Sequence, residues 1–200
     1  MLNEKAAARL MNSVLSSAPD SCPQLRKAWI DDAGRMCATN SYIAFRIGAL
    51  VAGVPDQDAK KAIDLDRIWP RDNGQLKPLE LPTLAELRAM MEEDRRKARA
   101  GEENPISGLY TFGTGEDGEQ LPAVNIAYLR DMLTMFPDAQ ALYISPIKPI
   151  LFQCNDGDGL IVPMRLYGKA FEAERRTAPA LRKRDKTPAL GLRTFAALYA

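Results

Sequence analysis

The stretch Val124-Asn125-Ile126-Ala127-Tyr128-Leu129-Arg130-Asp131-Met132-Leu133 decides the fold prediction. Asn125 is a favourable helix N-cap, and the helix that it begins is predicted to run to Phe136, because Pro137 stops it. The apolar residues of this segment recur at the spacing of one buried helical face: Ile126, Leu129, Leu133 and Phe136. A helix with one apolar face needs a sheet or another helix to cover that face.

Three short strands are predicted after this helix, and they supply such a sheet. They are Ala141–Ser145, Ile150–Cys154 and Leu160–Leu166. The sequence Asp156-Gly157-Asp158-Gly159 between the last two is typical of a hairpin turn. The last strand contains Val162-Pro163-Met164-Arg165-Leu166.

The first block of the chain has the same order of helix and strands. Asn3–Ser17 is predicted to be a helix capped by Asn3, with one apolar stripe formed by Ala7, Leu10, Met11 and Val14. Two strands, Leu25–Asp31 and Arg35–Ile47, are predicted to follow around the turn Asp32-Ala33-Gly34, with a bulge at Ala38-Thr39-Asn40. The repeated order predicts an α+β fold built from two similar units, with the two helices side by side on one face of the sheet.

The middle and the end of the chain differ from these two blocks. Within Val54–Gln120, Thr83–Ala100 is predicted to be a helix, because Thr83 and Glu86 can form a capping box, and Ile106–Phe112 a strand. From Lys169 onward there are eight Lys/Arg and only three Asp/Glu. The predicted organisation is therefore a single domain over residues 1–168, with an insertion at about 54–120, followed by a basic tail at 169–200.

The composition lowers the expectation of several classes of function. The chain has no histidine, which is the commonest general base and zinc ligand. Its three cysteines, Cys22, Cys37 and Cys154, are too far apart for a Cys-x-x-Cys metal site. The start has no secretion pattern, and no run approaches the ~20 apolar residues of a membrane span. We expect a cytoplasmic protein that has no metal, no other cofactor and no membrane contact.

Together these segments resemble the family of the bacterial DNA polymerase III beta subunit, the sliding clamp, and in particular its C-terminal domain. Val124–Leu133 matches the Asn-led helix of that family, and Val162–Leu166 matches its terminal Met-Pro-Met-Arg-Leu, with Val162 in place of Met. The segment Ala38-Thr39-Asn40-Ser41-Tyr42-Ile43-Ala44 is similar to the family's Ala-Thr-Asp-Ser-Tyr-Arg-Leu-Ala, departing at Asn40 and at Ile43-Ala44. The resemblance covers about residues 1–52 and 122–167, and it implies a DNA-clamp-like fold.

The resemblance also implies a function, that of a non-enzymatic sliding-clamp-like protein accessory to DNA replication or repair. Clamp helices offer Lys and Arg to the phosphates of double-stranded DNA, and the candidates here are Lys5, Arg9 and Arg130. The terminal clamp strand forms one wall of a pocket for peptides of DNA polymerases and other clamp-binding proteins. The candidates for that wall are Val162, Pro163, Met164, Arg165 and Leu166. Clamps carry three such domains per chain in a ring of two chains, so a ring would need an oligomer of six copies.

Two other functions remain open from the sequence. The chain could be a protein-interaction module that mimics a clamp surface without encircling DNA. It could also be an enzyme that uses carboxylates of the insertion. The acidic residues there, Asp56, Asp58, Asp64 and Asp66, have no pattern typical of a metal loop and are expected to be solvated.

Overall fold

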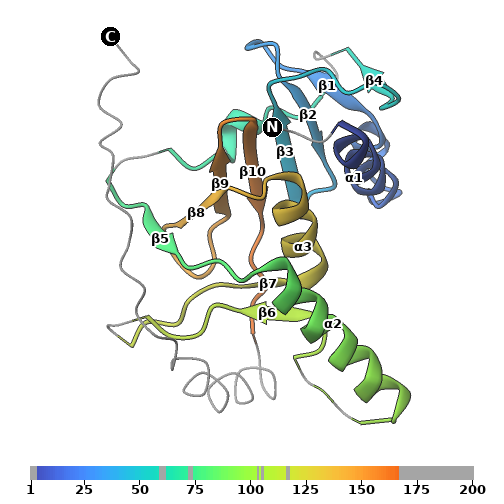
Figure 1. The fold of residues 1–200 in the computed structure, drawn as a ribbon. Coiled ribbons are helices and arrows are strands. Elements are labelled where there is room, and N and C mark those ends of the chain that lie inside the picture. The colour runs from blue at the N-terminus through green and yellow to red at the C-terminus, as the bar shows by residue number, and fades with distance from the viewer. Residues whose placement is uncertain are drawn as a thin grey trace.

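Two helices lie side by side on one face of a large sheet in the computed structural model of the chain (Figure 1). The structure describes residues 4–58, 62–71, 74–102, 104, 106–115 and 118–166, so the predicted tail and the predicted cap Asn3 lie outside the described residues. Helices α1 (Glu4–Ser16) and α3 (Ile126–Met135) contact each other, and each also contacts a strand of the sheet. The predicted α+β class and the predicted placement of the two helices are confirmed.

The sheet has eight strands in the order β4-β1-β2-β3-β10-β9-β8-β5. The central strands are β1 (Ala28–Ile30), β2 (Met36–Thr39), β3 (Ile43–Ile47), β8 (Gln140–Tyr143), β9 (Ile150–Cys154) and β10 (Gly157–Ile161). The two blocks of the sequence meet where β3 and β10 pair antiparallel, with Ile43 opposite Ile161. One continuous sheet therefore joins the beginning and the end of the described chain.

The insertion supplies both edges of this sheet. The two-residue strand β4 (Asp56–Gln57) pairs in parallel with β1, and β5 (Lys77–Leu79) pairs antiparallel with β8. The insertion also holds the 3-10 turn η3 (Leu65–Arg67), helix α2 (Leu84–Arg99) and strand β6 (Leu109–Thr111). Strand β6 pairs with β7 (Ala123–Asn125) in a separate two-stranded sheet. The sequence predicted neither β4 nor β5.

The helices begin where their capping residues predict. Asn125 accepts hydrogen bonds from the backbone N–H groups of Ala127 and Tyr128 at the start of α3. Thr83 and Glu86 form the predicted reciprocal capping box at the start of α2. All four residues of the predicted apolar stripe of α1 are buried.

Both faces of the sheet carry a core. On the helix face, Phe45 of β3 and Phe136 after α3 pack edge to face. On the opposite face a smaller core joins sheet residues to the insertion residues Ala62, Ile63, Leu65, Trp69 and Leu76. Its buried members are Trp29, Cys37, Ala44, Leu65, Leu151 and Leu160. Part of the insertion is thus a cover for the outer face of the sheet.

The prediction of one bulged strand over Arg35–Ile47 is wrong. Those residues form the two antiparallel strands β2 and β3, and the chain reverses at Asn40-Ser41-Tyr42. Ser41 has φ +80°, a left-handed conformation that is uncommon outside glycine. Asn40 stabilises the reversal, because its Oδ1 accepts hydrogen bonds from the backbone N–H groups of Tyr42 and Ile43.

Three further boundaries differ from the prediction. Pro23–Arg26 forms the 3-10 turn η1, so β1 begins only at Ala28. Cys154 pairs with Gly157, so the residues of the β9–β10 turn are Asn155 and Asp156 rather than Asp156–Gly159. Strand β10 ends at Ile161, which places Val162–Leu166 beyond the regular ladder.

Candidate functional site

The segment Val162–Leu166 follows β10, and its backbone is bonded to two other parts of the fold. The N–H group of Val162 donates to the carbonyl oxygen of Tyr42 at 2.8 Å, and that of Met164 donates to the carbonyl oxygen of Ala123 at 2.7 Å. The side chain of Met164 is 45% exposed and that of Val162 is 37% exposed. The side chains of Val162 and Met164 are therefore exposed to solvent, while hydrogen bonds fix the backbone at both residues.

Two tyrosines lie beside this segment, because Tyr42 accepts the backbone hydrogen bond of Val162. The rings of Tyr42 and Tyr128 are stacked, with centroids 6.4 Å apart, and Tyr42 is 53% exposed. Asn40 is fully buried beneath them, and its Nδ2 donates to the hydroxyl oxygen of Tyr128 at 3.3 Å. We call the surface formed by Tyr42, Tyr128, Val162 and Met164 the terminal patch.

The terminal patch includes part of the predicted peptide-binding set. Of that set, Val162, Met164 and Arg165 are exposed, whereas Pro163 and Leu166 are half-buried. The two tyrosines were missed, because the pairing of residue 42 with residue 128 is a tertiary contact without a local signal. Methionine suits an adaptable apolar contact, and tyrosine adds a flat ring with a polar edge. The patch can therefore receive the apolar side chains of a short extended segment.

The predicted DNA-binding residues lie on α1 and α3, the two helices on one face of the sheet, which we call the helix layer. They do not form a uniform basic surface. Lys5 and Arg9 of α1 are exposed, and neither has an ion-pair partner among the described residues. Arg130 of α3 is half-buried, and its Nη2 lies 2.6 Å from Oδ1 of the buried Asp131. The charge of Arg130 is therefore compensated within the helix, which leaves two of the three cations available.

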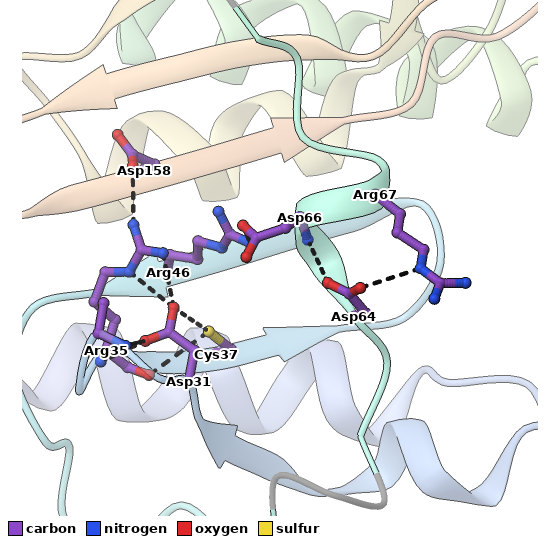
Figure 2. Close-up of polar contacts among 9 residues, drawn as sticks. Asp31, Arg35, Cys37, Arg46, Asp64, Asp66, Arg67 and Asp158 are labelled. Atoms are coloured by element: carbon purple, nitrogen blue, oxygen red, sulfur yellow. Dashed lines mark hydrogen bonds and ion pairs between the residues drawn. The ribbon is translucent and has the colours of Figure 1, made fainter.

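A buried arginine marks the outer face of the sheet (Figure 2). Arg46 of β3 is only 4% exposed. Its Nη2 donates to Oδ1 of Asp66 at 2.6 Å, and its guanidinium lies 4.0 Å from the centre of the Trp69 ring. Its Nε has no hydrogen-bond partner among the described residues. Since Asp66 and Trp69 belong to the insertion, Arg46 holds the insertion against the sheet.

A second cluster of polar side chains lies next to Arg46 and surrounds Arg35. Arg35 pairs with Asp31 at 2.8 Å and lies 3.9 Å from Asp158 (Figure 2). Burial acts to raise the pKa of Asp31, but hydrogen bonds and the charge of Arg35 lower it below its usual value. Burial, reinforced by the charge of Asp31, raises the pKa of Cys37 to about 12. The Cys37 thiol is therefore protonated at neutral pH and is not an activated nucleophile.

An open hollow of about 280 Å³ adjoins these groups, and three of its carboxylates, those of Asp31, Asp64 and Asp66, have structural partners. Asp64 caps η3 and pairs with Arg67, while Asp66 pairs with Arg46. Within the described ranges, no three His, Cys, Asp or Glu side chains come together in a way that could hold a metal ion. Asp64 and Asp66 therefore help to hold this part of the insertion in place.

The described helices include none that is both long enough and apolar enough to cross a membrane.

No protein-family model and no curated protein matches the sequence. Solved structures do match. The DNA polymerase III beta subunit of Thermotoga maritima has a TM-score of 0.51 at 12% identity, over 83% of this chain and 65% of that chain. The beta chain from Streptococcus pneumoniae has a TM-score of 0.50 at 16% identity, over 82% of this chain and 64% of that chain. The sliding clamp of Bacillus subtilis has a TM-score of 0.50 at 12% identity, over 83% of this chain and 64% of that chain.

These similarities are similarities of fold. The resemblance to sliding clamps that the sequence motifs indicated is confirmed at this level. The matches span slightly less than two thirds of the length of the clamp chains.

Proposed function

From the premise that this chain folds like the bacterial sliding clamps, we propose that it is a non-enzymatic, clamp-like protein accessory to DNA replication or repair. Its principal activity in this proposal is to bind short segments of polymerase-type partner proteins at the terminal patch. The observation that supports this most is the position of Met164, which is 45% exposed on a backbone bonded to Ala123.

The terminal patch is preorganised for such binding. Its backbone is bonded to two separate parts of the fold, at Tyr42 and at Ala123, so little conformational entropy would be lost when a partner binds. Exposed apolar residues that lie next to one another often mark interaction sites. The partner is expected to place one or two large apolar side chains against Met164 and the Tyr42 ring.

A peptide titration tests this function. A fluorescein-labelled, polymerase-derived clamp-binding peptide is titrated with the wild-type chain, with Met164→Glu and with Leu50→Glu. Leu50 is the matched control, because it is 71% exposed and follows β3 at the opposite end of the sheet from Tyr42. We expect Met164→Glu to lose binding and Leu50→Glu to retain it, with both variants as stable as wild type. Equal binding by all three would exclude the terminal patch as the binding surface.

Binding of double-stranded DNA by the helix layer is a second candidate. It is favoured by Lys5 and Arg9, which are exposed on α1. It is disfavoured by the Arg130–Asp131 pair, because a compensated cation offers little to a phosphate. We therefore propose DNA contact as weak and independent of sequence, and secondary to partner binding.

A further inference from the structure

We infer that the terminal patch is covered by an apolar segment of the chain's own tail, so that partner peptides must displace it. The segment is 190–200, which contains Leu192, Phe195 and Leu198. This inference rests on the proposed function, because it takes the terminal patch to be a peptide-binding surface.

The first argument is the position from which the tail leaves the domain. Met164 belongs to the terminal patch, and the tail follows only a few residues later, after Leu166. The 25 residues Tyr167–Gly191 can reach about 80 Å when extended at ~3.3 Å each. Leu192 is thus within easy reach of the surface beside which the tail begins.

The second argument is the distribution of apolar side chains in the tail. Its basic part, Lys169–Lys186, contains seven of its eight Lys/Arg. The following segment is the richest part of the tail in large apolar side chains, namely Leu190, Leu192, Phe195, Leu198 and Tyr199. Such a group gains free energy by leaving water, and the terminal patch offers an apolar surface that stands exposed in the described part of the chain.

The third argument is concentration. A peptide tethered to its site acts at an effective concentration on the order of millimolar. A dissociation constant of about 100 μM for the tail segment would then keep about nine-tenths of the sites occupied. A free peptide would find about one site in ten open, so its dissociation constant would rise about tenfold.

The test compares full-length chains by two measurements. The tail variant is Leu192→Asp with Phe195→Asp, and its control is Ala178→Asp with Ala180→Asp, which adds the same charges to the tail outside the apolar segment. We expect the tail variant to bind the labelled polymerase-derived peptide about tenfold more tightly than wild type, and the control to bind as wild type. In ¹³C-methyl NMR spectra, the Met164 methyl resonance is expected to move in the tail variant and not in the control.

The two measurements separate this inference from the proposed function. If the peptide binds all chains equally and the Met164 resonance does not move, the inference is wrong and the proposed function stands. If no chain binds the peptide but the resonance moves, the tail covers the patch and the proposed function fails. A Met164 shift that depends on protein concentration would overturn covering by the chain's own tail, because it would show docking onto a second copy.

Discussion

Gly157 of β10 lies against the backbone of Arg46 on β3. A Cβ atom at Gly157 would be 2.2 Å from the carbonyl oxygen of Arg46 and 3.1 Å from the Cα atom of Ile47. Both contacts are with backbone that is paired in the sheet, so the contact cannot be relieved by a side-chain rotation. The glycine is therefore required where the two halves of the sheet join.

We expect Gly157→Ala to lower the free energy of unfolding by about 1–3 kcal/mol, the usual cost of overpacking. Gly48→Ala is the matched control at the same end of the sheet, because the nearest atom to its new Cβ is the carbonyl oxygen of Asp156, 3.9 Å away. Urea denaturation of the two variants measures the difference. Equal stabilities would show that the β3–β10 junction relaxes freely.

The Arg46–Asp66 pair predicts an unequal response to mutation. Arg46→Met keeps an apolar stem in the buried position and removes the unpartnered Nε, so we expect a change within about 1 kcal/mol. Asp66→Ala leaves the buried guanidinium without its partner and is expected to be more destabilising than Arg46→Met. Arg67→Met, in an exposed pair with Asp64, is the control and should have little effect. The opposite order of stabilities would contradict a role for Asp66 in compensating the charge of Arg46.

Cys37 predicts a loss of stability in alkaline solution. Its pKa in the folded chain is about 12, against an ordinary thiol value of 9.0. Between these two values the unfolded chain releases the thiol proton and the folded chain keeps it. The free energy of unfolding therefore falls as the pH rises, by up to about 1.4 kcal/mol per pH unit. Because other groups also titrate, the quantity to measure is the difference between wild type and Cys37→Ala in urea from pH 8 to 10.5. That difference should change with pH, and parallel curves would show that the folded thiol ionises normally.

The short edge strands of the sheet predict a monomer in solution. Edge strands invite pairing with another chain, and short strands, proline and lysine prevent it. Strand β4 has two residues, and β5 contains Lys77 and Pro78. Light scattering after size exclusion should give 22.1 kDa for wild type, and Pro78→Val should promote association. Pro137→Val, away from the sheet edge, is the control. A stable hexamer of the wild-type chain would instead support a ring.

The helix layer predicts weak, salt-sensitive binding of duplex DNA. Lys5→Glu with Arg9→Glu is expected to weaken the binding seen by fluorescence anisotropy at low salt, because each phosphate contact releases counterions. Lys27→Glu with Arg99→Glu, at exposed cations outside the two layer helices, is the control. The same measurements on a chain that ends at Gly168 separate the helix layer from the basic tail. Binding that survives high salt would contradict the proposed phosphate contacts.

Local signals in the sequence predicted the helices and failed at long-range contacts. The capping residues Thr83 and Asn125 placed the starts of two helices, because a cap bonds to its own first turn. The turn at Asn40-Ser41-Tyr42 was missed, because Ser41 takes a left-handed conformation without being glycine. Gly157 was assigned to a turn, although its contact with Arg46 across the sheet explains it better.

The candidate site was predicted in part for the same reason. Motif resemblance pointed to Val162–Leu166, and the structure places Met164 there in solvent. The resemblance did not indicate that Tyr128 belongs to the candidate site. Tyr128 joins the terminal patch only because the fold stacks it on Tyr42. The resemblance also could not reveal that Asp131, the neighbour of Arg130, is buried and compensates its charge.

The pairing of β3 with β10 has a consequence for synthesis on the ribosome. Ile43 pairs with Ile161 in the sheet, so β3 cannot complete its pairing until most of the domain has been translated. That takes on the order of ten seconds at ~5–20 residues per second. During that interval the β2–β3 hairpin has an open edge, and until α3 has been translated its apolar face lacks Phe136, which packs on Phe45. Nascent chains of this protein are therefore expected to engage holding chaperones before β10 emerges, and fragments that stop short of Gly157 are expected to aggregate.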